Sequence, residues 1–172
     1  MAHPAQQEFC RDVKLRFPDF FGNTHVLEVG SRDVNGSVRD EFTNSNYIGI
    51  DAEAGKGVDE VCLGHEYQSD LGPFDVTCSL ETFEHDPHAP QTVANMLKLL
   101  RPGGLFFMTC AGEGRKEHGT RRTGTLYGPD ANYYQNVSLS MFLDWIEATS
   151  FEELYLKHNK AVSDLYCFAI KA

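Results

Sequence analysis

The 172-residue sequence predicts one α/β domain built on an open, mostly parallel sheet of seven strands. Short apolar runs alternate with amphipathic helical patterns, and this order favours a parallel sheet with helices on both faces. Only a few residues separate the last two apolar runs, which is too few for a crossover helix. These two runs must therefore form a hairpin, so that one strand near the sheet edge runs antiparallel to the others.

Seven strands and four helices are expected. The strands cover residues 25–30, 47–51, 59–64, 74–80, 104–111, 153–158 and 164–170. The helices cover residues 4–17, 34–42, 90–100 and 138–149. A long loop, residues 112–136, is rich in Gly, Arg and Tyr and separates the fifth strand from the last helix.

Hydrophobic spacing identifies the first elements. In the N-terminal helical segment, residues 1–22, Phe9, Val13 and Phe17 recur every four residues, as on one face of an amphipathic helix. The run HVLEVG is continuous and β-branched, which is typical of a strand buried on both faces. A glycine turn and a helical pattern follow it, and then come the short strands YIGID and DEVCLG.

The crossovers around the third strand are short. Only AEAGKGV and HEYQSDLGP connect this strand to its neighbours in the chain, and neither segment has room for a full helix. We therefore expect thin cover over this edge of the sheet, with the N-terminal helix or a second subunit protecting it. A homodimer is one way to provide that cover.

The second half repeats the pattern more regularly. FDVTCSL follows the turn signal Gly72-Pro73, and PQTVANMLKLL has Pro90 in its first turn and apolar residues at helical spacing. The segment RPGG ends this helix, and GLFFMTCA forms the fifth strand. SLSMFLDWIEAT is helical, and ELYLKH with DLYCFAI closes the sheet as the hairpin.

The charge balance argues against nucleic acid as a partner. The formal net charge is −10, whereas nucleic-acid binding requires a basic face. The one basic concentration, Arg115-Lys116 with Arg121-Arg122, is interpreted as a solvated loop. No apolar stretch approaches the ~20 residues of a membrane helix, and the N-terminus lacks the apolar core of a secretory signal. We expect a cytoplasmic protein with no membrane partner.

The five cysteines are expected to be reduced thiols. Their number is odd, and Cys62, Cys78, Cys110 and Cys167 lie inside apolar runs. A zinc site would need closer Cys/His spacing than this sequence has. These four residues are therefore predicted to lie in the core.

The turn after the first strand differs from a dinucleotide-binding turn. Gly30 and Gly36 are present, but Arg32 stands where the middle glycine of G-x-G-x-x-G would let a pyrophosphate approach. Glu28 precedes the turn, and an acid there disfavours a phosphate and favours a cation. Asp51 ends the second strand, where a carboxylate suits the two hydroxyls of a ribose. S-adenosylmethionine fits this pattern, because it combines an adenosine with a sulfonium and an ammonium and has no phosphate.

At this point the chain resembles the class I S-adenosylmethionine-dependent methyltransferases. The motifs appear in the order VLEVGSRDVNGSVR, YIGID, VDEVCLGHEY, FDVTCSLETFEHD and LLRPGGLFFMT. The fit is closer to a subgroup of small methyltransferase-domain proteins that share a VGS..VNGS.R turn and an AG.GR.EHGT loop. Residues 25–112 carry most of the match. The resemblance implies a Rossmann-like methyltransferase domain over residues 1–172, with S-adenosylmethionine as cofactor and S-adenosylhomocysteine as product.

The resemblance also implies a set of cofactor-binding residues. They are Glu28, Gly30, Ser31, Asp51, Ala52, Gly64, His65, Glu66, Ser79 and Leu80. The first three lie beside the methionine portion, while Asp51 holds the ribose and Ala52 lies next to the adenine. The three residues after the third strand border the adenine, and the last two approach the methionyl amine and the methyl group. Each residue also has a structural alternative, such as a turn glycine, a cap or a loop position without ligand contact.

Two histidines are the catalytic candidates. Methyl transfer from a sulfonium depends mainly on alignment, and a general base is needed only if the acceptor must lose a proton. His85 follows the fourth strand and His118 lies in the loop after the fifth, so either is placed to act as base or to orient the acceptor. The alternatives are a helix-capping role for His85 and simple solvation for His118.

The segment Glu84-His85-Asp86-x-His88 contains metal-ligating residue types. Adjacent residues point in different directions, however, and Asp86-Pro87 is typical of a turn. No metal is therefore expected.

The loop over residues 112–136 is predicted to be the substrate loop, because long loops in compact domains are usually functional. Its arginines are placed to bind a carboxylate or phosphate of the acceptor, and its tyrosines to form an apolar wall or stack on a sugar. The alternative is a lid without substrate contact. The candidates are Arg115, Arg121, Arg122, Tyr127, Tyr133 and Tyr134.

The sequence therefore predicts methyl transfer to a small-molecule or glycan-like acceptor. One alternative is a module that binds S-adenosylmethionine without catalysis. A nicotinamide-dependent oxidoreductase is disfavoured by the missing glycine, by the acid before Gly30 and by the lack of a Tyr-x-x-x-Lys pair. The acceptor and the methylated atom are left open.

Overall fold

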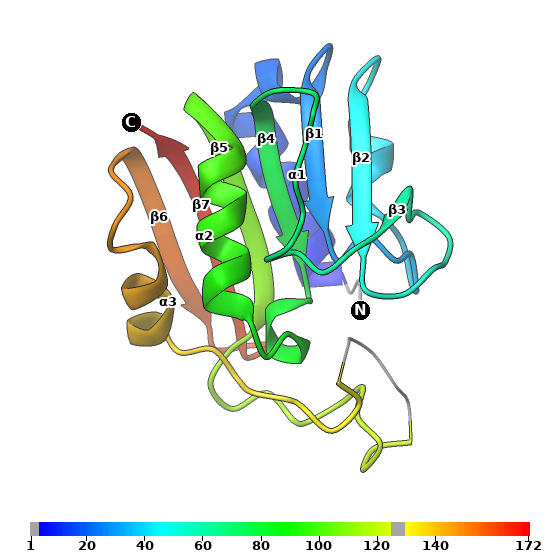
Figure 1. Cartoon of the computed structure of the whole chain (residues 1–172). Helices are drawn as coiled ribbons and strands as arrows, with labels where there is room; N and C mark the ends of the chain where they lie inside the picture. Colours follow the sequence, from blue (N-terminus) through cyan, green and yellow to red (C-terminus); the bar gives the residue numbers. More distant parts are fainter. Residues whose placement is uncertain (1–3, 125–129) are drawn as a thin grey trace.

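The computed structural model describes residues 4–124 and 130–172 as one open, seven-stranded sheet in the order β3-β2-β1-β4-β5-β7-β6 (Figure 1). The strands are β1 (His25–Val29), β2 (Asn46–Asp51), β3 (Glu60–Val61), β4 (Phe74–Leu80), β5 (Leu100–Ala111), β6 (Phe151–Asn159) and β7 (Asp164–Lys171). β7 is antiparallel to β5 and β6, and the other pairs are parallel. The predicted hairpin and single reversed strand are confirmed.

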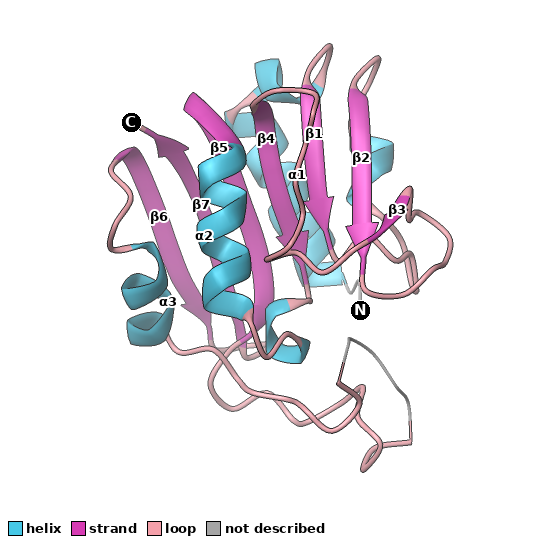
Figure 2. Cartoon of the chain, in the orientation of Figure 1, coloured by secondary structure: helices cyan, strands magenta, loops and turns pink. Residues whose placement is uncertain are grey.

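Helices cover both faces of the sheet, as predicted (Figure 2). The α-helices are α1 (Pro4–Arg16), α2 (Ala89–Leu99) and α3 (Leu139–Ile146). Three short 3₁₀ helices are η1 (Pro18–Phe21), η2 (Val38–Glu41) and η3 (Phe83–His85). One core layer lies between the sheet and α1, η1 and η2, and the other lies between the sheet and α2 and α3.

α1 packs over the middle of the sheet and over β7, with Phe9 stacked on Tyr166 at 4.7 Å between ring centroids. Cys10 of this helix is buried, whereas Cys62 is only half-buried and is thus not the core residue that its apolar run predicts. Val61 of the edge strand β3 remains 61% exposed. The N-terminal helix therefore does not protect that edge.

α2 buries the face that its periodicity predicts. Val93 and Met96 are completely buried, and each contributes roughly 1.5–3 kcal/mol by removing its side chain from water. Pro90 lies in the first turn, where its missing N–H costs nothing. No helix in the described ranges is long and apolar enough to cross a membrane.

The prediction of a helix over residues 34–42 is wrong. The chain after β1 is irregular, and only the single 3₁₀ turn η2 forms. Asp33 Oδ1 accepts a hydrogen bond from the N–H of Gly36 at 2.7 Å, and Ser37 Oγ accepts one from the N–H of Arg39 at 3.1 Å. Such local bonds compete with helix formation, and Gly36 has a φ of +117°. This segment therefore turns.

Two strand boundaries also differ from prediction. β3 has only two residues rather than the whole of 59–64, because the chain turns at Leu63, whose carbonyl accepts from the N–H of Glu66 at 3.0 Å. β5 begins at Leu100, directly after α2, rather than at Gly104. A register shift in its pairing with β4 accommodates the extra residues, so RPGG ends the helix inside a strand rather than in a loop.

The long loop between β5 and α3 lies at the end of the sheet to which the parallel strands point (Figure 1). Its two ends are joined by a parallel bridge between Gly112 and Val137. The described part of the loop contains turns but no helix or named strand. Tyr127 lies outside the described residues.

Candidate active site

A cleft opens at the C-terminal ends of β1, β2 and β4. In an open α/β sheet, ligands bind at this edge. The predicted residues that line the cleft are Glu28, Gly30, Ser31, Asp51, Ala52, Gly64, Leu80 and His85. The strand order reverses direction between β1 and β4, so the cleft lies at the switch point of the topology.

Gly30 joins the two sides of the cleft. Its φ is +79°, and a Cβ at this position would lie 1.9 Å from Thr82 Oγ1. The glycine therefore allows the turn after β1 to contact the segment after β4. Gly64 has a similar role in packing, because a Cβ there would lie 2.5 Å from Thr92 Cγ2. Both positions require glycine because a neighbouring side chain lies too close for a Cβ, whether or not a ligand is bound.

Asp51 anchors the turn that follows β2. Its Oδ1 accepts from the N–H of Glu53 at 3.0 Å, and its Oδ2 accepts from the N–H of Arg32 at 3.2 Å. Burial raises the pKa of the Asp51 carboxyl, while these two hydrogen bonds lower it. The guanidinium of Arg32 forms an ion pair with Glu53 instead of occupying the place of the missing glycine.

Glu28 is buried within β1. The hydroxyl of Tyr47 donates to Glu28 Oε2 at 2.9 Å. Burial raises the pKa of Glu28 to about 7, and the Tyr47 hydrogen bond opposes this effect. Glu28 thus places a carboxyl group at the β1 side of the cleft, and its charge changes near neutral pH.

Three of the predicted cofactor-binding residues, and the catalytic candidate His118, are not among those that line the cleft. Ser79 is buried within the sheet, where its Oγ donates to the carbonyl of Val29 at 2.8 Å. The ring of His65 packs against that of His88 at 4.3 Å, and Glu66 lies 3.9 Å from the His65 Nε2.

Other lining residues are not among the predicted cofactor-binding or catalytic residues. Gln6 of α1 is buried at the cleft although it comes from a distant helix. Cys62 and Leu63 belong to an apolar run that predicts only a strand. The further lining residues are Val29, Arg32, Val34, Asn35, Gly36, Glu81, Thr82 and Asp86.

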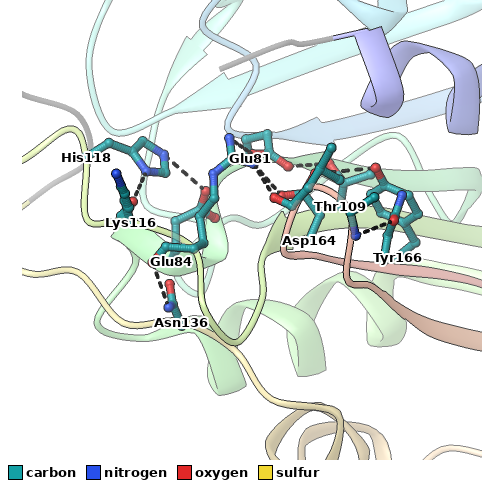
Figure 3. A network of polar contacts seen from close by, with 12 residues as sticks. Glu81, Glu84, Thr109, Lys116, His118, Asn136, Asp164 and Tyr166 are labelled. Atoms are coloured by element: carbon teal, nitrogen blue, oxygen red, sulfur yellow. Dashed lines mark hydrogen bonds and ion pairs between the residues drawn. The ribbon is translucent and has the colours of Figure 1, made fainter.

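Glu81 connects the cleft to a buried polar cluster (Figure 3). Its backbone has a φ of +55°, which is strained for a residue with a side chain. The hydroxyl of Thr109 donates to Glu81 Oε1 at 2.9 Å, and Arg115 pairs with Asp164 at 2.7 Å while lying 4.0 Å from Glu81. Burial raises the pKa of Glu81 to about 8, with a further contribution from Glu84.

The predicted catalytic histidines lie together. The rings of His85, His118 and Tyr134 pack against one another in T-shaped contacts, with 5.1–5.4 Å between ring centroids. His118 Nε2 is 3.7 Å from Glu84 Oε1 (Figure 3). Burial lowers the pKa of His85 to about 3 and also lowers that of His118, so both imidazoles are neutral near pH 7.

Two of the loop arginines contact groups of the protein itself. Arg115 is held by Asp164 and by the carbonyl of Val162, and Arg122 pairs with Glu117 at 2.7 Å. Two of the three predicted arginines therefore have partners within the protein. Among the loop tyrosines, Tyr134 packs against the histidines.

Comparisons with known proteins were made with both sequence and structure. No protein-family model matches the sequence, and no curated protein matches it. The Burkholderia thailandensis 1,6-didemethyltoxoflavin-N1-methyltransferase, solved with 1,6-didemethyltoxoflavin and S-adenosylhomocysteine, matches with a TM-score of 0.68 and 13% identity. The match covers 98% of this chain and 78% of that enzyme.

Two further solved structures are similar. The N-methyltransferase NodS from Bradyrhizobium japonicum, in complex with S-adenosyl-L-homocysteine, gives a TM-score of 0.61 at 16% identity, over 96% of this chain and 86% of NodS. The N-terminal domain of EvdMO1, solved in the presence of S-adenosylhomocysteine and D-fucose, gives 0.68 at 12% identity, over 100% and 85% of the two chains. The chain therefore has the Rossmann-like fold of class I S-adenosylmethionine-dependent methyltransferases.

Proposed function

We propose that this protein binds S-adenosylmethionine in the cleft and transfers its methyl group to a small acceptor, releasing S-adenosylhomocysteine. The observation that carries the proposal is the acidic cleft at the switch point. Glu28 and Asp51 face a cavity in which the lining cation, Arg32, is tied to Glu53. A cationic adenosine cofactor suits this cleft better than a phosphate does.

The cofactor is proposed to lie across the ends of β1 and β2. Asp51 accepts hydrogen bonds from the ribose hydroxyls, because each of its oxygens retains a lone pair beyond its backbone contact. Ala52 and Gly64 border the adenine, and Glu28 with Gly30 lies toward the methionine portion. Ser31 and Leu80 complete this set, while His65, Glu66 and Ser79 contribute less because they do not line the cleft.

The methyl group is proposed to face η3. A lone pair of the acceptor attacks the methyl carbon, the carbon–sulfur bond breaks, and its electron pair remains on sulfur. His85 lines the cleft at this point, with His118 behind it. A neutral imidazole can orient an acceptor or receive its proton. The acceptor class that we propose is a small molecule or a glycan-like compound.

A nicotinamide cofactor is disfavoured by the backbone after β1. A pyrophosphate normally binds to the N-terminus of an α-helix that follows the glycine turn. Here the turn leads into an irregular segment and then into the single 3₁₀ turn η2. The described residues provide no helix dipole at this place.

Calorimetric titration of S-adenosylhomocysteine tests the cofactor. We expect saturable binding to the wild type and a Kd at least about tenfold higher for Asp51→Ala, equivalent to about 1.4 kcal/mol. Asp144→Ala, an exposed change on α3, is the matched control and should leave the Kd unchanged. Melting curves confirm that both variants are folded. Wild-type protein that binds NADH and not S-adenosylhomocysteine would refute the proposal.

A second measurement separates catalysis from binding alone. Wild-type protein is incubated with radiolabelled S-adenosylmethionine and a panel of small amines, phenols and sugars. Label transferred to one class of acceptor supports an enzyme and identifies the acceptor. Cofactor binding without transfer to any member would favour a non-catalytic binding module.

A further inference from the structure

We propose that Glu84, His85 and His118 form a binding site for a divalent transition-metal ion of the zinc class at the acceptor side of the cleft. One ligand atom from each residue can be chosen so that all lie within 4.8 Å of one another. The three come from η3 and from the loop after β5. Metal binding here is independent of the cofactor proposal.

The spacing in this cluster suits a shared ion better than a direct hydrogen bond. Glu84 Oε1 and His118 Nε2 are 3.7 Å apart, whereas a charge-assisted hydrogen bond is about 2.7–2.9 Å long. Zinc bonds of about 2.0–2.1 Å in a tetrahedron place two ligand atoms about 3.3 Å apart. A small side-chain movement would therefore let these two residues hold one ion.

Glu84 is a buried carboxylate without a hydrogen-bond partner of normal geometry among the described residues. The side chain of Glu84 is fully buried, and neither of its carboxylate oxygens has such a partner. Burial raises the pKa of Glu84, and the backbone N–H groups of Glu84 and Ala111 oppose this rise without meeting that geometry. A bound cation would supply the partner that an ionised carboxylate needs in this buried position. The carboxylate points toward His118 Nε2 (Figure 3).

The hydrogen bonding of His118 directs a lone pair toward the same point. Its Nδ1 lies 3.1 Å from the carbonyl of Lys116. A carbonyl can only accept, so Nδ1 carries the proton and the neutral ring presents its lone pair at Nε2. His118 Nε2 has no hydrogen-bond partner in the described structure. A backbone carbonyl on the far nitrogen is the usual arrangement around a metal-ligating histidine.

The surrounding acidic groups also favour a cation. Glu81 and Asp164 lie near Glu84, and in the described part of the chain Arg115 lies within 4.0 Å of both. A bound cation would favour the ionised forms of these acidic groups. Two imidazoles and one carboxylate suit zinc or iron, whereas magnesium and calcium prefer oxygen ligands alone.

Three protein ligands would leave a coordination position open. His85 lines the cleft, so the open side faces the place where the acceptor is proposed to bind. We infer that the ion would coordinate an oxygen or nitrogen of the acceptor, in place of proton transfer to His85, and this role rests on the proposed function. The sequence pattern over residues 84–88 disfavours a metal when taken alone, but the third ligand comes from the distant loop.

The test is a cobalt titration of the full chain after treatment with a chelator. We expect visible absorption bands that saturate at one equivalent of Co²⁺, disappear when Zn²⁺ is added and persist with Mg²⁺. Glu84→Gln and His118→Ala should each weaken Co²⁺ binding at least about tenfold. His25→Gln, at the opposite end of β1, is the matched histidine control and should bind as the wild type does.

Both ligand variants are expected to fold. Glu84→Gln preserves the size of the side chain, and His118 lies in a loop and has side-chain exposure of 22%. Titration of S-adenosylhomocysteine into the same variants checks the cleft and should give the wild-type Kd. If the wild type binds cobalt through His118 but has no affinity for S-adenosylhomocysteine, the metal site is supported and the proposed function is refuted.

The inference is overturned if the wild type shows no saturable cobalt spectrum. It is equally overturned if Glu84→Gln and His118→Ala bind Co²⁺ as tightly as His25→Gln does. In either case the buried carboxyl is protonated or bound to solvent, and the cluster is a hydrogen-bonding network only.

Discussion

The two sides of the cleft are built from different kinds of contact. At the ends of β1 and β2, backbone turns shape the cleft, with a positive φ at Gly30 and with Asp51 accepting from backbone N–H groups. At the end of β4, buried side chains from distant segments shape it, as where Thr109 of β5 donates to Glu81 and Arg115 lies 4.0 Å from the same carboxyl. The difference teaches that local sequence can encode the first side, while only long-range packing can encode the second.

The strongest test of the backbone-built side is Gly30→Ala. The new methyl group would meet Thr82 at 1.9 Å, and the left-handed φ of +79° adds strain. We expect a loss of about 3–4 kcal/mol in the free energy of unfolding, measured in urea, together with loss of S-adenosylhomocysteine binding.

Gly72→Ala is the matched control for that change. Gly72 has the same φ of +79°, but a Cβ added there would have no atom within 4 Å. It should cost only the backbone strain, about 1 kcal/mol. Equal losses for the two variants would show that close approach to Thr82 does not shape the cleft.

The buried acid on the same side predicts a pH effect. Burial raises the folded-state pKa of Glu28 to about 7 from 4.5 in the unfolded chain. The folded state therefore holds this proton more tightly, so its contribution to stability is full below pH 4.5 and is lost as the pH rises toward 7. Between about pH 5 and pH 8 the wild type should lose about 2 kcal/mol in its free energy of unfolding through Glu28, and Glu28→Gln should remove this loss.

Urea unfolding at several pH values measures this effect. The difference between wild type and Glu28→Gln should grow with pH in favour of the variant and then become constant above about pH 7. The pKa of Glu81 is also raised, to about 8, so the stability of the wild type alone reports on both carboxyl groups. Only the difference between the wild type and Glu28→Gln isolates Glu28. A difference that is independent of pH would contradict the prediction.

The side-chain-built side is tested by comparing two arginines of the loop. Arg115→Gln removes the cation that contacts the fully buried Asp164 and leaves only a neutral donor, so we expect a loss of about 1.5–3 kcal/mol. Arg122 pairs with Glu117 at the surface, and its side chain is 57% exposed. Arg122→Gln should therefore cost less than about 0.5 kcal/mol.

Thermal and urea unfolding of the two variants give the comparison. Arg115→Gln should also loosen the described part of the loop, which hydrogen exchange measures at residues 112–124. If both arginines contribute equally, the loop is attached by surface charge alone, and the contrast between the two sides of the cleft fails.

The strands and α2 could be predicted because their signals are local. HVLEVG and FDVTCSL are continuous apolar runs, and α2 carries apolar residues at helical spacing with Pro90 in its first turn. The helix predicted over 34–42 fails for a local reason as well. Asp33 and Ser37 bond to nearby backbone N–H groups, and this competition is not visible in a hydrophobic pattern.

The candidate site was predictable in the same uneven way. Gly30 and Asp51 follow strands directly, so their place at the cleft follows from strand direction. The proximity of His118 to Glu84 does not follow from any spacing, because a long loop returns to the sheet to bring them together. The partner of Arg115 could not be predicted for a related reason, since Asp164 lies on the distant strand β7.

By itself, the sequence determined the order of strands and helices, the reversed strand of the closing hairpin, and the acidic residues that follow the first two strands. These features depend on periodicity, glycine turns and chain direction, all of which are local. Only the tertiary structure decided that Glu84, His85 and His118 share one point, and that Arg115 belongs to Asp164 rather than to an acceptor. These pairings depend on how distant segments pack around buried polar groups, because the packing decides which partner lies close enough to each group.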